Sequence, residues 1–157
     1  MFSSYFTSIE NSGIGHVIRS SNWMFPVIEA FHLVGLAMLG GAVLIVDMRL
    51  FGIGLREQPV ARLARDVRPW FFGSLALMLI SGPLLFMSES VKCYYSTAFW
   101  VKMAFLGMAI IYTFTLHRKV VASDEMGITP FSSKLAAIVS IVLWSGVGIG
   151  GRLIGFQ

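Results

Sequence analysis

The sequence has little charge and almost no cysteine. Of its 157 residues, 13% are charged and 56% are apolar, a balance outside that of ordinary soluble domains. The single cysteine, Cys93, cannot form a disulfide within the chain, so it is free, intermolecular, a ligand or an ordinary loop thiol. Glycine-rich phosphate loops, Cys-x-x-Cys pairs and Ser/His/Asp hydrolase patterns are missing, so hydrolytic catalysis has no visible nucleophile.

The sequence has long apolar segments and lacks the alternating pattern of β-strands. The apolar segments extend over about residues 23–46, 70–87, 98–116 and 135–154, and each is close to the ~20 residues that cross a hydrocarbon core. These segments and their connections take up nearly the whole chain. We therefore expect one all-α membrane domain over residues 1–157, a transmembrane four-helix bundle.

The segment before the first span has its own pattern. Apolar side chains such as Phe2, Phe6 and Val17 recur at near-helical spacing, which predicts a short interfacial helix over about residues 2–20. Asn11-Ser12-Gly13 is the point where this helix can break. Because Glu10 and Asn11 interrupt the apolar run, we expect no cleaved signal peptide.

Basic residues flank the spans unevenly. The connections after spans one and three contain Arg49, Arg56, Arg62, Arg65, Arg68, Arg118, Lys119 and Lys134. The opposite side has Arg19, Lys92, Lys102 and Arg152. The positive-inside rule then places the first set in the cytoplasm and both termini in the periplasm of a bacterial inner membrane. The net charge of +4 is explained by topology, so we expect no nucleic acid partner.

Ionisable residues occur inside the apolar spans. At about 100° per residue, Glu29, His32 and Asp47 fall on one narrow stripe that must face the bundle interior. A charge at mid-bilayer costs roughly 2.5–3.5 kcal/mol on the insertion scale, so these groups need partners or a ligand. A similar stripe on span three runs from Lys102 to His117. The residues expected to form a polar network are Glu29, Asp47, Arg49 and Lys102.

His32 and His117 mark separate sites. His32 lies about eight residues below the outer end of span one, whereas His117 ends span three, which runs in the same direction. The two are then ~18 Å apart along the membrane normal, too far to bind one iron. This spacing suits two haems, one near each leaflet, and equally suits two unrelated hydrogen bonds.

The leading hypothesis is a small b-type cytochrome-like protein for electron transfer, which as an enzyme would be a membrane oxidoreductase. His32 would bind haem b opposite His16 or a methionine of span two, and His117 would bind a second haem. Arg152 would neutralise a propionate, and Trp144, in mid-span, would line the pocket or pack the core. The expected cofactor-binding residues are His32, His117, His16, Arg152 and Trp144.

Two other functions remain open. One is a copper- or zinc-handling protein, or an ion or proton conductor, with His32, His117, His16 and Glu29 as the candidate metal ligands. The other is a structural subunit in which Glu29 pairs with Arg152, and Asp47 with Arg68, only to fix helix register.

Glycines on span four predict close helix packing. Gly146 and Gly150 have the small-xxx-small spacing that lets two backbones, or a flat cofactor, approach. Such a face can also join two copies of the chain. We therefore expect a homo-oligomer, with the redox partner unspecified.

Two short patterns carry a family resemblance. Residues 23–35 read W-x-x-P-x-x-E-x-x-H-x-x-G, and residues 47–52 read D-x-R-L-x-G. Together with Lys102, His117, Trp144 and Gly151-Arg152, they resemble a bacterial family of four-helix inner-membrane proteins known as a domain of unknown function. The resemblance covers almost the whole chain and implies no reaction. The family pattern includes Glu29, His32, Asp47, Arg49, Lys102, His117 and Arg152, but not His16.

Overall fold

A computed structural model describes residues 2–54, 57–123 and 130–156, so Arg56 lies outside the described residues. The described chain is helical and has no strand, which confirms the all-α prediction. Its elements are α1 (Phe2–Glu10), α2 (Gly13–Ser20), α3 (Met24–Phe51), α4 (Val60–Ser88), α5 (Ser90–Tyr95), α6 (Thr97–Tyr112), the π-helical turn η1 (Thr113–His117), α7 (Arg118–Ser123) and α8 (Pro130–Ile154).

Four helical stretches are long and apolar enough to cross a membrane: α3, α4, α6 continued through η1 and α7, and α8. They fit a multi-pass membrane protein. The helices are longer than the apolar segments, since α4 begins at Val60 and α3 continues to Phe51. Hydropathy marks only the lipid-embedded part of a helix, whereas arginine favours helix and lets α4 extend beyond it.

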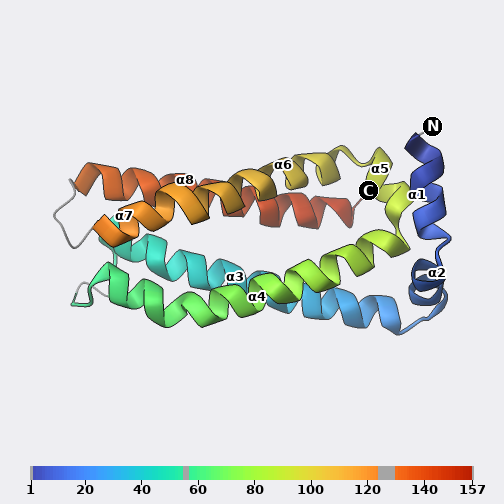
Figure 1. Ribbon diagram of the computed structural model, residues 1–157, viewed down its shortest axis with the longest axis horizontal. Helices are drawn as coiled ribbons and strands as arrows, with labels where there is room; N and C mark the ends of the chain where they lie inside the picture. Colours follow the sequence, from blue (N-terminus) through green and yellow to red (C-terminus); the bar gives the residue numbers. More distant parts are fainter. Residues whose placement is uncertain (1, 55–56, 124–129, 157) are drawn as a thin grey trace.

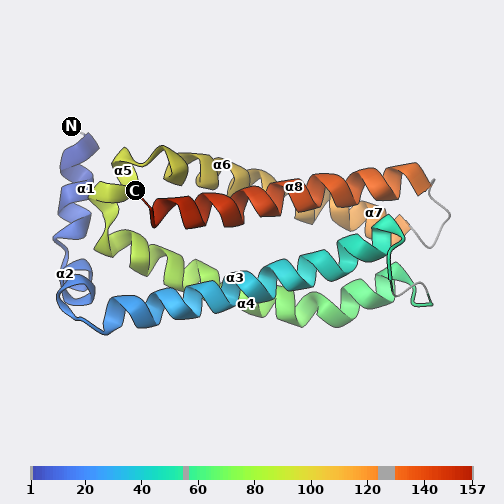
Figure 2. The same cartoon turned by 180° about the vertical axis from the view of Figure 1, so that it is seen from behind.

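The four long stretches run side by side, and both chain termini lie at the same end of the bundle (Figures 1 and 2). Helix α3 packs against α4 and α8, and α6 packs against α8. Helices α1, α2 and α5 lie across the terminal end. The last turns of α3 and α7 and the first turns of α4 and α8 lie at the opposite end, called the loop end. A chain with an even number of spans has both termini on the same side, as this arrangement shows.

The N-terminal segment is two helices where one was expected. Ser12 caps α2, because its Oγ accepts a hydrogen bond from the backbone N–H of Gly15 at 3.3 Å. The Glu10 carboxylate accepts from the Val91 N–H at 2.8 Å and pairs with Arg19. These bonds hold α1 and α2 against the start of α5.

The predicted glycine face of α8 is used within the subunit. A methyl group at Gly146 would overlap the Phe105 ring of α6, and one at Gly150 would lie 3.0 Å from Lys102 Cβ. The two glycines therefore let α6 and α8 approach closely. Self-association of the chain stays a prediction. Gly146 and Gly150 are used inside the subunit, so they do not form the contact surface between two copies.

We expect Gly146→Ala to destabilise the protein by about 1–3 kcal/mol, because the added methyl overpacks the Phe105 ring. Thermal unfolding in detergent, followed by circular dichroism, measures the change. Gly107→Ala on α6 is the control, since nothing lies within 4 Å of its added methyl. Equal effects of the two substitutions would contradict the packing described here.

Candidate functional site

The described part of the bundle has a cavity toward each of its ends. The terminal cavity has a volume of about 540 Å³, and residues that line it include Glu29, His32, Met78, Lys102 and Arg152. The loop cavity has a volume of about 430 Å³, and its lining includes Arg65, Arg68, His117, Arg118 and Ser140. His32 and His117 thus belong to different sites, as their spacing in the sequence predicts.

A packed apolar layer separates the cavities. Its buried residues are Leu39, Val43, Ala109, Trp144 and Val147. The Trp144 indole N–H donates to Thr113 Oγ1 at 3.2 Å, and its ring meets the Phe71 ring edge-on at 6.2 Å. Trp144 therefore packs the middle of the bundle and is not among the residues that line either cavity.

His32 is held by a serine of the neighbouring helix. Its Nδ1 lies 2.8 Å from Ser81 Oγ, and Ser81 Oγ lies 2.7 Å from the Leu77 carbonyl oxygen. The Ser81 hydroxyl has one proton, and it donates this proton to the Leu77 carbonyl, because a carbonyl oxygen can only accept a hydrogen bond. The hydrogen bond between His32 and Ser81 then needs a proton from the imidazole ring. We therefore assign a proton to His32 Nδ1, which donates to Ser81 Oγ. Nε2 then carries the lone pair, and it has no hydrogen-bond partner among the described residues.

Ser81 belongs to a pattern that the sequence analysis did not detect. Ser74, Ser81 and Ser88 recur every seven residues on α4, and all three are buried. Each hydroxyl donates to a carbonyl of its own helix, so the series satisfies itself in an apolar setting. Ser81 alone of the three also bonds a histidine. The seven-residue spacing of these serines in the sequence could have predicted the series.

Charged groups of both signs line the terminal cavity. Arg152 lies over the Phe156 ring at 5.5 Å, and Lys102 lies along Gly150 and Gly151. Glu29 and Arg152 line the same cavity but form no ion pair with each other. The register-fixing pair expected between them is therefore not seen.

His16, a candidate ligand in the sequence, lies away from the terminal cavity. It is exposed on α2 and is not among the residues lining the terminal cavity. Within residues 2–54, 57–123 and 130–156, no three His, Cys, Asp or Glu side chains are grouped to hold a metal ion. His16, His32 and Glu29 are thus not brought together as one ligand set.

At the other end, Asp47 and His117 form a buried pair. His117 Nε2 lies 2.7 Å from Asp47 Oδ1, and Asp47 has no exposed surface. Asp47 Oδ2 is buried without a hydrogen-bond partner in the described structure. His117, and not Arg68, is therefore the partner of Asp47. Both residues end the interior stripes of their spans, and both lie at the loop end of the bundle.

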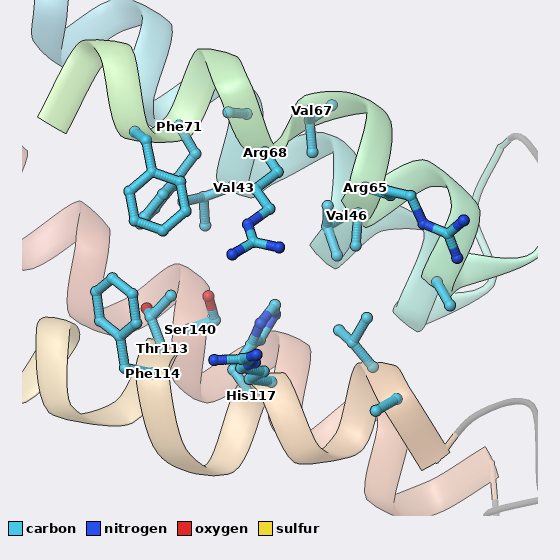
Figure 3. A pocket seen from close by; sticks show the side chains of 17 residues that line it. Val43, Val46, Arg65, Val67, Arg68, Phe71, Thr113, Phe114, His117 and Ser140 are labelled. Atoms are coloured by element: carbon cyan, nitrogen blue, oxygen red, sulfur yellow. The ribbon is translucent and has the colours of Figure 1, made fainter.

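A π-helical turn shapes the loop cavity. η1 inserts extra backbone between α6 and α7 and places Thr113, Phe114 and His117 along the cavity wall. Figure 3 shows these side chains facing Arg68 and Phe71 of α4 across the cavity. Single π-helical turns are found frequently at functional sites. Arg49 lies outside this wall and donates from Nε to the Gln58 carbonyl at 2.8 Å.

Cys93 is buried in α5 at the wall of the terminal cavity. Burial, and secondly the nearby Glu89 carboxylate, raise the pKa of its thiol above the ordinary value. A thiol in this state is a poor nucleophile and a poor metal ligand at neutral pH.

A family model described as a family of unknown function (DUF6644) matches residues 5–157. The chain belongs to this family. Comparisons with curated proteins and with solved structures gave no match. Family membership confirms the resemblance found in the sequence, and the function must be argued from the two cavities themselves.

The Asp47–His117 pair can be tested by a double-mutant cycle. We expect Asp47→Leu and His117→Phe each to destabilise the protein, by roughly 3–5 kcal/mol where one member of a buried pair is left alone. The double variant should lose clearly less than the two losses added together. Unfolding in detergent measures all three. Additivity within about 0.5 kcal/mol would show that the two residues are not coupled.

Cys93 should react slowly with a maleimide. Its raised pKa means that less thiolate is present at pH 8 than for an ordinary cysteine, so its rate should begin to rise at a higher pH. The control is Tyr95→Cys in a Cys93→Ser background, because Tyr95 is 73% exposed on the same helix. Mass spectrometry gives both rates. Equal pH profiles for the two cysteines would refute the buried state of Cys93.

Proposed function

We propose that the protein binds one b-type haem in the terminal cavity through His32 Nε2 and takes part in electron transfer in a bacterial inner membrane. The observation that carries this proposal is the chain from His32 Nδ1 through Ser81 Oγ to the Leu77 carbonyl. Histidines that bind a metal almost always donate their other ring N–H in this way. The bond fixes the ring and leaves Nε2 free to ligate.

The lining of the terminal cavity supports a porphyrin. Its volume of about 540 Å³ lies within the usual range for ligand pockets. Gly148 and Gly155 also line the cavity, and the absence of side chains at these two positions leaves space for a flat ring. Met78 lines the same cavity, and its thioether would be available as a second ligand to the iron.

Two cations of the cavity and the serine behind His32 have roles in this proposal. Arg152 and Lys102 would neutralise the two propionates, as cations near carboxylates do in apolar surroundings. Ser81 would hold the His32 ring at a fixed angle. When bound, haem supplies one-electron redox chemistry, and the protein supplies the ligands and the surrounding charge.

The proposal places haem at His32 only. Nε2 of His117 already bonds to Asp47 at 2.7 Å, and a second haem at that histidine would require the buried pair to open. With the arginine-rich loop end in the cytoplasm, as the positive-inside rule requires, the terminal cavity lies on the periplasmic side. Electrons would then be exchanged near the outer leaflet.

Protein purified from a haem-sufficient host should show the Soret band and the reduced α band of a b-type haem. His32→Ala should remove both bands, and Ser81→Ala should weaken haem binding by about 10- to 100-fold, because the ring loses its support. Ser74→Ala is the matched control, since its hydroxyl bonds only to its own helix. Haem titration and iron analysis measure the effects.

The His117→Ala variant, where it folds, should contain as much iron as the wild-type protein. Colourless wild-type protein that haemin does not change would rule out the proposal, and stoichiometric copper or zinc without iron would favour a metal-handling protein. Loss of about half the iron in His117→Ala would instead show two haems.

A further inference from the structure

The loop cavity concentrates positive charge without a matching acid. Arg65, Arg68 and Arg118 line it, and no aspartate or glutamate is among its lining residues. None of the three arginines forms an ion pair with a described residue. In Figure 3, Arg68 extends from α4 into the space above η1, toward His117, whereas Arg65 lies closer to the loops. Guanidinium groups have the planar fork of donors that binds carboxylate and phosphate.

Arginines at the end of a span can also extend to lipid headgroups in the interface, without any bound ligand. Ser140 shows that more is involved. It is 1% exposed on α8 and lines the cavity, yet its Oγ has no hydrogen-bond partner in the described structure. Buried hydroxyl groups are nearly always bonded. An unpartnered O–H in a cavity that arginines also line fits a ligand that brings acceptor oxygens.

Part of the cavity lining is apolar. It is formed by Phe71, Phe72 and Phe114 with Val43 and Val46. Arg68 Cζ lies 5.5 Å from the centre of the Phe72 ring, so its guanidinium is where the polar and apolar walls meet. A ligand that satisfies both walls must be charged at one end and apolar at the other.

We infer that the loop cavity binds an amphipathic anion, meaning a carboxylate or phosphate group attached to an apolar chain. The head binds Arg68, Arg118 and the Ser140 hydroxyl, and the chain lies against the phenylalanine wall. The cavity volume of about 430 Å³ suits one such molecule. This chemistry is shared by an acidic membrane lipid and by a free fatty acid. The inference does not depend on haem binding at His32.

Binding of labelled dodecanoate to the protein in phosphatidylcholine nanodiscs tests the inference, with empty nanodiscs as the background. We expect one saturable site, and at least tenfold weaker binding of dodecanol, which has the same chain without the charge. Arg68→Gln should weaken dodecanoate binding about tenfold or more, because it removes charged hydrogen bonds. Arg62→Gln is the matched control, since Arg62 is exposed on α4 outside the cavity and should leave binding unchanged.

Ser140→Ala and Arg118→Gln provide independent variants should Arg68→Gln fail to fold, and each should also weaken dodecanoate binding. Equal affinity for dodecanoate and dodecanol, or equal losses in Arg62→Gln and Arg68→Gln, would overturn the inference. So would acetate binding as tightly as dodecanoate, because the apolar wall would then contribute nothing. Repeating the titration in His32→Ala separates this result from the haem proposal.

The source of the anion follows from a second set of nanodiscs that contain phosphatidylglycerol. If this lipid displaces dodecanoate, the natural occupant is the headgroup region of an acidic lipid. If it does not, the cavity selects a free anionic amphiphile. Both results support the inferred chemistry and assign its origin.

Discussion

The hydrogen bond between Asp47 and His117 is the constraint on which the arrangement of the bundle depends. Helix α3 packs mainly on α4 and α8, and η1 packs on α6, α7 and α8, so this bond is the direct polar link between α3 and η1. A carboxylate with no exposed surface cannot be placed in apolar surroundings without a partner. The pair therefore fixes the register of the two helices and holds the His117 ring, which lines the loop cavity.

The same requirement for satisfied polar groups explains the difference between the two histidines. His117 has its Nε2 bonded by a carboxylate, whereas His32 has its Nδ1 bonded by a serine that is itself bonded to Leu77. The first arrangement occupies the nitrogen that usually ligates haem, and the second leaves it free. Two histidines on parallel spans thus have different chemistry because different neighbours hold their rings.

Sequence reasoning determined the number of spans and the separation of His32 from His117, because both follow from length and helical rise. It could not determine the partner of Asp47, because an angular stripe says only that a residue faces inward. The π-helical turn that carries His117 changes the helical angle locally, and no residue pattern signals it. The placement of Ser81 beside His32 depends on the register between α3 and α4, which hydropathy leaves open.

The packed middle layer governs how the two cavities can communicate. Trp144 bonds to Thr113, which lines the loop cavity, and Val147, one turn further along α8, lines the terminal cavity. Both residues are buried in one apolar cluster with Leu39 and Ala109. Such a close-packed layer excludes a continuous water path but transmits small shifts of its side chains.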